Sequence, residues 1–110
     1  MEGQSEKVIA VSDAAKKDLE QEYFYYAQNY SIEAAEKLRI GFNKEILKIL
    51  PNPYIYPECR FLLTKTQIYR NIVWGNYLII YKIKKDCIEV LSVFHTKQKP
   101  AKVKLVRKRK

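Results

Sequence analysis

The chain has 110 residues, of which 47% are hydrophobic, and a formal net charge of +9. A domain of this length buries roughly 60–70% of the surface that its unfolded chain exposes, which allows one core but no enclosed cofactor cavity. We therefore expect one domain whose working site is a surface groove, without a bound cofactor.

The cysteines and the N-terminus exclude further classes of protein. Cys59 and Cys87 have no Cys or His neighbours at the spacing of a metal site, so we expect two reduced thiols and no bound metal. Residues 1–5 lack the apolar core of a secretion signal. The longest strongly apolar run, Tyr77–Tyr81, is far too short to cross a bilayer. We expect a cytoplasmic protein that does not bind a membrane.

The positive charge is concentrated at the C-terminus. Residues 97–110 contain eight Lys or Arg side chains and no acid, whereas the rest of the chain has 13 basic and 12 acidic residues. We expect an N-terminal extension over 1–6, a folded domain over 7–96 and a basic tail over 97–110. Such a tail attracts phosphates and also acidic proteins, so a plain nucleic-acid-binding domain is one possible interpretation.

The first 30 residues predict one strand and one helix. The β-branched run Lys7–Val11 is typical of a strand. Ser12 is a favourable N-cap and Asp13 suits the first turn, so we expect a helix from Asp13 to Tyr30. Apolar side chains recur there at spacings of three and four, at Ala15, Leu19, Tyr23, Tyr26 and Tyr30.

A second helix is predicted directly after the first. Ser31 provides an N-cap, and Pro51 and Pro53 end the apolar periodicity after Leu50. Two amphipathic helices with so short a connection are expected to form an antiparallel hairpin. Gly41 lies inside the second helix, where we expect it to let the two helices approach closely.

The second half of the chain predicts strands. Three runs rich in β-branched and aromatic residues follow one another, at Thr66–Trp74, Tyr77–Ile83 and Cys87–Phe94, after a short strand or extended segment at Arg60–Leu63. Gly75-Asn76 is typical of a two-residue hairpin turn. The element order β-α-α-β-β-β predicts an α+β domain, with the N-terminal helix hairpin packed on a small antiparallel sheet. The first strand has to pair with this sheet non-locally.

Four segments resemble a known family, in the order Ser12-x-x-Ala15-x-x-Asp18-Leu19, Tyr69-Arg70, Gly75–Tyr81 and Ile88–His95. Together they resemble the RelE/ParE superfamily of toxins from type II toxin–antitoxin (plasmid stabilisation) systems. The resemblance implies a RelE/ParE-like fold and a growth-inhibiting toxin. It also implies a cognate antitoxin as partner, with which the toxin can form a hetero-oligomer. We expect the antitoxin to lie in a groove between the helix hairpin and the sheet.

The resemblance leaves two targets open. ParE-like toxins poison DNA gyrase and are not enzymes, whereas RelE-like toxins are endoribonucleases that cut mRNA on the ribosome. RelE-like nucleases tend to have an aromatic residue after the last strand and several basic residues on the central strands. Here residues 96–100 contain no aromatic residue, and residues 69–83 carry only Arg70 and Lys82 as basic side chains. The sequence therefore favours the ParE-like branch.

The candidate site residues follow from the two branches. A RelE-like nuclease would use His95, Arg70 and Tyr81 for catalysis, because RNA cleavage needs an acid, a base and a cation. In either branch we expect Arg70, His95, Lys97 and Lys99 to contact the target or its phosphates. Structural roles are the alternative: Arg70 can pair with Glu89 or another acid, Tyr81 can pack in the core, and a histidine at a strand end can be part of the framework.

Overall fold

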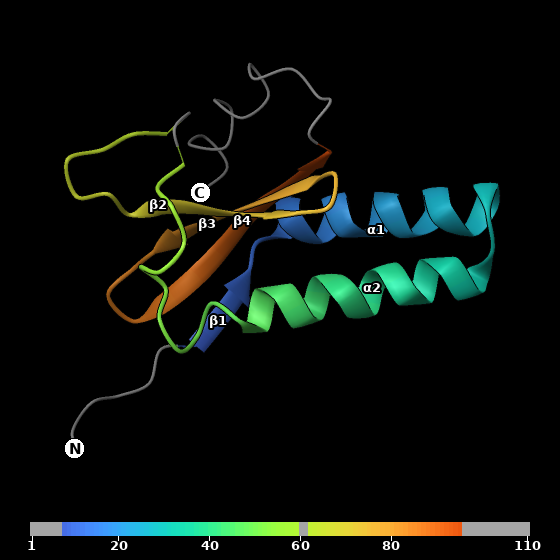
Figure 1. Ribbon diagram of the computed structural model, residues 1–110, viewed down its shortest axis with the longest axis horizontal. Coiled ribbons are helices and arrows are strands. Elements are labelled where there is room, and N and C mark those ends of the chain that lie inside the picture. Colours follow the sequence, from blue (N-terminus) through green and yellow to red (C-terminus); the bar gives the residue numbers. More distant parts are fainter. Residues whose placement is uncertain (1–7, 60–61, 96–110) are drawn as a thin grey trace.

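The computed structural model describes residues 8–59 and 62–95, which form two helices and one four-stranded sheet (Figure 1). The elements are β1 (Val8–Val11), α1 (Asp13–Asn29), α2 (Ile32–Leu47), β2 (Tyr69–Trp74), β3 (Tyr77–Ile83) and β4 (Cys87–His95). This order and the α+β class confirm the prediction from the sequence. The predicted extension over 1–6 and tail over 97–110 lie outside the described residues.

The sheet has the order β1-β4-β3-β2. β2, β3 and β4 form the predicted antiparallel meander, and Gly75 has the positive φ of 60° that its tight turn requires. β1 pairs in parallel with β4, from Val8 opposite Cys87 to Val11 opposite Val90. The predicted non-local pairing of the first strand is confirmed, but its direction is parallel, so the sheet is mixed rather than antiparallel. Parallel neighbours need a long crossover connection, and here the helix hairpin is part of that connection.

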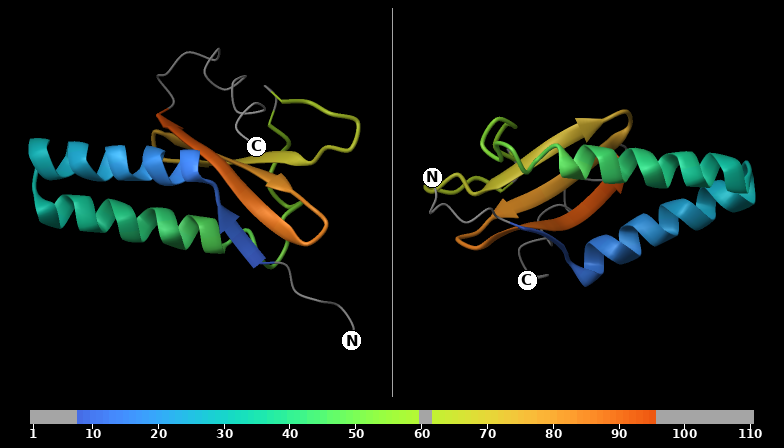
Figure 2. Two further views of the ribbon diagram at one scale, coloured as in Figure 1. Left: turned by 180° about the vertical axis from the view of Figure 1, so that it is seen from behind. Right: turned by 90° about the horizontal axis from the view of Figure 1, so that it is seen from below.

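The helices form the predicted antiparallel hairpin. Figure 2 shows that α1 and α2 lie close together at the loop that joins them, diverge toward the sheet, and extend past its end. Both predicted N-caps are confirmed. The Ser12 hydroxyl accepts a hydrogen bond from the Ala15 amide, and the Ser31 hydroxyl accepts one from the Ala34 amide, each at 3.0 Å.

Three predicted boundaries need correction. α2 ends at Leu47 rather than Leu50, because the chain tightens into three-residue turns such as the bond from the Ile49 amide to the Ile46 carbonyl at 3.1 Å. β2 begins at Tyr69 rather than Thr66, because Gln67 has a φ of 55° and closes a turn. In the expected segment 60–63, the two residues that the structure describes, 62 and 63, form no strand.

Apolar side chains cover both faces of the sheet. One face packs against the helices, and its buried cluster includes Phe42, Ile46, Ile72, Tyr77, Ile79, Tyr81, Ile88 and Val90. The other face packs against the segment before β2, in a cluster of Cys59, Leu62, Tyr69, Ile80, Leu91 and Phe94. Successive side chains of β3 point to opposite faces of the sheet and therefore belong alternately to the two clusters.

β4 contains a β-bulge that α1 stabilises. Ile80 lies opposite Ser92 but Tyr81 lies opposite Val90, so Leu91 has no partner in the ladder. The Ser12 hydroxyl donates to the Leu91 carbonyl at 3.1 Å. Asp18 of α1 accepts hydrogen bonds from the Ser92 hydroxyl at 2.7 Å and from the Val93 amide at 3.0 Å. Side chains from the start of α1 thus bond to backbone groups at the interrupted part of the ladder.

Gly41 has a different role from the one expected. A Cβ atom at this position would overlap the indole ring of Trp74, not a residue of α1. The glycine therefore makes room for a side chain of β2 rather than for the other helix. Trp74 also meets Phe42 edge-on, with ring centroids 5.0 Å apart. This contact docks α2 against the sheet.

Replacing Asp18 tests the anchoring of the bulge. We expect Asp18→Ala to lower the free energy of unfolding by about 2–3 kcal/mol, because it removes a charged acceptor from two hydrogen bonds. Asp13→Ala, at an exposed position in the first turn of the same helix, should cost only about 0.5 kcal/mol. Urea denaturation measures both values. Equal, small losses for the two variants would contradict the assigned role of Asp18.

Candidate functional site

Tyr81 lies in the core beneath the loop that joins α2 to β2. It is opposite Arg70 in the ladder between β2 and β3, and its side chain is fully buried. Its hydroxyl donates to the Pro53 carbonyl at 2.5 Å. Burial raises the pKa of Tyr81 well above its ordinary value. The hydroxyl therefore stays protonated and holds the loop.

Arg70, the ladder partner of Tyr81, binds the same loop. Its guanidinium donates to the carbonyls of Gln67 at 3.0 Å, Tyr54 at 3.1 Å and Tyr56 at 2.9 Å. It also lies over the Tyr54 ring, 5.0 Å from the centroid. Arg70 and Tyr81, two of the three predicted catalytic residues, thus bind backbone carbonyls of residues 53–56.

The alternative partner expected for Arg70 is wrong. Glu89 of β4 forms an ion pair at 2.7 Å with Lys84 of the turn between β3 and β4, and Arg70 has backbone carbonyls as acceptors instead. Every residue has a backbone carbonyl, so the sequence does not show which carbonyls Arg70 binds. An acidic side chain such as Glu89 was the partner that the sequence could suggest.

His95 lies at the other end of the sheet. It is the last residue of β4, is half-buried, and stands opposite Tyr77 in the ladder. Arg70 stands opposite Tyr81, four residues farther along β3, which corresponds to about 13 Å along the strand. The structure therefore does not gather His95, Arg70 and Tyr81 around one point. Lys97 and Lys99 lie outside the described residues.

A polar cluster next to His95 was not predicted. The Tyr77 hydroxyl donates to Glu22 Oε1 of α1 at 2.8 Å. Burial, followed by hydrogen bonds to Tyr26 and Glu22, raises the pKa of Tyr77 far above its ordinary value. Glu22 and Tyr26 are one helical turn apart, so the sequence places them on one face of α1. Nothing in the sequence indicates that this face meets Tyr77.

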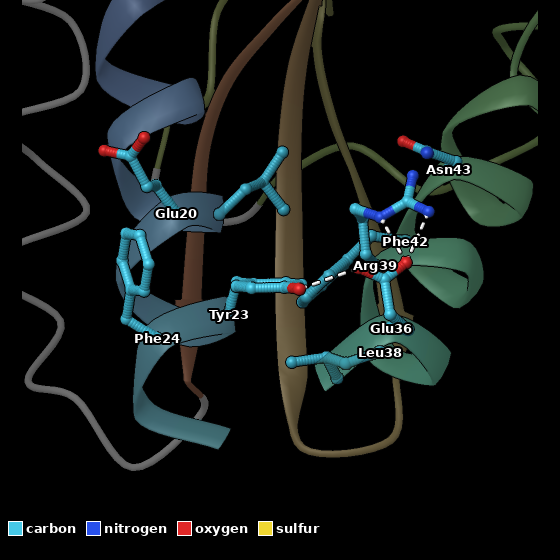
Figure 3. Close-up of a pocket in the computed structure, with 9 residues that line it drawn as sticks. Glu20, Tyr23, Phe24, Glu36, Leu38, Arg39, Phe42 and Asn43 are labelled. Atoms are coloured by element: carbon cyan, nitrogen blue, oxygen red, sulfur yellow. Dashed lines mark hydrogen bonds and ion pairs between the residues drawn. The ribbon is translucent and has the colours of Figure 1, made fainter. Parts of the chain in front are cut away.

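The structure contains a cavity of about 300 Å³ between α1 and α2. It is lined by Leu19, Glu20, Tyr23, Phe24, Glu36, Leu38, Arg39, Phe42 and Asn43 (Figure 3). All of these residues belong to the two helices, so the hollow is not between the hairpin and the sheet, where we expected a groove.

A polar bridge spans this cavity. The Tyr23 hydroxyl of α1 donates to Glu36 of α2 at 2.7 Å, and Arg39 binds the same carboxylate at 2.6 Å (Figure 3). Arg39 and then Tyr23, as hydrogen-bond donors, hold the pKa of Glu36 below its ordinary value. The cavity therefore combines apolar walls with an ionised carboxylate, that of Glu36, which the bridge holds in place.

The described residues contain no group of three or more His, Cys, Asp or Glu side chains that could hold a metal ion. Cys59 and Cys87, both in the described part of the chain, form no disulfide. In residues 8–59 and 62–95, neither helix has the length and apolar character that a membrane crossing requires.

Replacing Arg70 tests its role in holding the loop. We expect Arg70→Lys to lower the free energy of unfolding by about 1–3 kcal/mol, because one ammonium group cannot reproduce the bonds to three carbonyls. Hydrogen exchange of the amides at 54–56 should become faster. Arg39→Lys, in a solvent-exposed ion pair on α2, should leave the stability close to that of the wild type. Wild-type stability and exchange in Arg70→Lys would refute the assignment.

Comparison with known proteins agrees with the fold and identifies the family. The sequence model of the family described as ParE toxin of type II toxin-antitoxin system, parDE, matches residues 9–100, well over half of the chain. A solved chain of the chromosomal ParDE TA system from P. aeruginosa has the same fold, with a TM-score of 0.68 at 13% sequence identity, and the match covers 81% of this chain and 95% of that chain. Among curated proteins, no sequence matches. The predicted resemblance is thus confirmed in its ParE-like branch, and the chain belongs to the ParE toxin family of type II toxin–antitoxin systems.

Proposed function

We propose that this ParE family member is a cytoplasmic, growth-inhibiting toxin that acts on DNA gyrase by contact rather than by catalysis. The observation that carries the proposal is the separation of the candidate catalytic groups. RNA cleavage needs an acid, a base and a cation around the same phosphate. Arg70 and Tyr81 instead bind the loop before β2, and His95 lies about 13 Å from them along the sheet.

His95 is the residue that we assign to the target contact. It is half-buried at the point where the chain leaves β4, and it is the single histidine of the protein. In the sequence Lys97 and Lys99 follow it, so an imidazole and two ammonium groups occur within five residues. We infer that these three side chains contact the target, with the lysines attracting acidic groups.

A supercoiling assay with purified gyrase tests the proposed target. We expect the wild-type protein to inhibit supercoiling at micromolar concentration, and His95→Ala to weaken the inhibition roughly tenfold, the effect of losing one hydrogen bond to a charged group. Val73→Ala, at an exposed position of β2, is the control and should inhibit as the wild type does. Unimpaired supercoiling in the presence of the wild-type protein would rule out gyrase as the target.

We also propose that a cognate antitoxin occupies the cavity between α1 and α2. A volume of about 300 Å³ admits one or two large apolar side chains. The walls are apolar at Leu19, Leu38 and Phe42, and Glu36 and Arg39 offer polar groups at the rim. An amphipathic helix that inserts its apolar residues fits such a site, and its binding would create a toxin–antitoxin hetero-oligomer.

Two neighbouring aromatic residues allow a matched test of this site. Phe24 lines the cavity and is 56% exposed, whereas Tyr25 is 53% exposed but does not line it. Phe24→Ala should weaken the binding of the antitoxin about tenfold or more, because it removes an apolar anchor. Tyr25→Ala should leave the affinity within about twofold. Isothermal titration with the antitoxin encoded beside the toxin gives both constants. Equal effects of the two substitutions would place the antitoxin elsewhere.

A further inference from the structure

A row of aromatic side chains connects α2 with His95. Trp74 of β2 stacks on Tyr77 of β3 with ring centroids 6.4 Å apart, and Phe42 of α2 meets each of these rings at 5.0 Å. Tyr77 meets the His95 ring edge-on at 5.4 Å. Because packed rings restrict one another's rotation, the orientation of the imidazole depends on that of Tyr77.

The Tyr77 ring is fixed at its far end by α1. Its side chain is only 5% exposed, and its hydroxyl donates to the Glu22 carboxylate at 2.8 Å. Burial and the bonds with Tyr26 and Glu22 raise the pKa of Tyr77, so the hydroxyl remains a donor even at alkaline pH. A hydrogen bond to a carboxylate is of the stronger, charge-assisted class. The strand thus holds one end of Tyr77 and the helix holds the other.

Packing alone does not require a tyrosine here. A phenylalanine would fill the same space between Trp74, Phe42 and His95, and would not bring a hydroxyl and a carboxylate out of water. What the bond between Tyr77 and Glu22 adds is a fixed direction of the ring. That direction bears on His95, because the imidazole lies against the ring at the end of the sheet.

We propose that Tyr77, anchored by Glu22, is a positioning residue that orients the His95 imidazole toward the target. This inference rests on the proposed function, because it takes the contact of His95 with gyrase as given. It adds two residues that do not themselves touch the target.

The experiment uses the full-length protein and its single histidine as a spectroscopic probe. The imidazole signals are recorded by NMR, and the inhibition of gyrase supercoiling is measured, for the wild type and for Tyr77→Phe, Glu22→Ala and Glu22→Gln. Tyr69→Phe is the matched control, because Tyr69 is also buried, at 4% exposure, but belongs to the cluster on the opposite face of the sheet.

We expect Tyr77→Phe and Glu22→Ala to shift the imidazole signals and to weaken inhibition by roughly five- to tenfold, less than or equal to the loss in His95→Ala. Glu22→Gln retains a hydrogen-bond acceptor for the Tyr77 hydroxyl. Its imidazole signals and its inhibition should therefore stay close to those of the wild type. Tyr69→Phe, which also removes the hydroxyl of a buried tyrosine, should change neither the imidazole signals nor the inhibition. This contrast separates positioning from a general loss of stability.

Three results would overturn the inference. The first is that Tyr77→Phe leaves the imidazole signals unchanged. The second is that Tyr77→Phe shifts these signals without any loss of inhibition. Either result would mean that Tyr77 does not position His95 for binding. The third is that His95→Ala inhibits gyrase as well as the wild type does. This result would refute the contact assigned to His95 but not gyrase as the target. A wild-type protein that does not inhibit gyrase would instead refute the proposed function itself.

Discussion

The arrangement of the molecule depends on the anchoring of the β4 bulge by the first turns of α1. Ser12 and Asp18 bond to backbone groups around Leu91. The bulge shifts the register between β3 and β4, so that Tyr77 comes opposite His95. The same bonds fix α1 along β4, and this places Glu22, one turn beyond Asp18, against Tyr77. The sequence pattern Ser12-x-x-Ala15-x-x-Asp18 therefore has a physical basis: a helix cap, a small residue buried at the contact, and an acceptor for the bulge.

This framework divides the polar residues between two ends of the sheet. At one end, Arg70 and Tyr81 hold the loop between α2 and β2 by binding its carbonyls. At the other end, His95 lies against Tyr77, whose hydroxyl is bound by Glu22. In the sequence, His95, Arg70 and Tyr81 could supply a base, a cation and an acid. In the structure, His95 lies at the opposite end of the sheet from Arg70 and Tyr81. An interaction protein tolerates this separation, whereas a nuclease does not.

The sequence predicted the elements well because their signals are local. The Ser12 and Ser31 caps, the Gly75 turn and the alternation in β3 each depend on a few neighbouring residues. The failures are long-range. The parallel pairing of β1, the contact of Gly41 with Trp74 and the carbonyl partners of Arg70 join segments that are far apart in the chain or lack a side-chain signature. For the same reason Glu22 could not be recognised as a partner of Tyr77.

We propose that this ParE family member acts by contact and cuts no nucleic acid itself. The most direct test maps the 5′ ends of a reporter mRNA in a cell-free translation reaction that contains the purified protein, beside a known ribosome-dependent nuclease as positive control. We predict that the mRNA remains intact at protein concentrations that stop gyrase supercoiling. New 5′ ends at codon boundaries, lost in His95→Ala, would contradict this account and show that His95 takes part in catalysis without Arg70 and Tyr81 beside it.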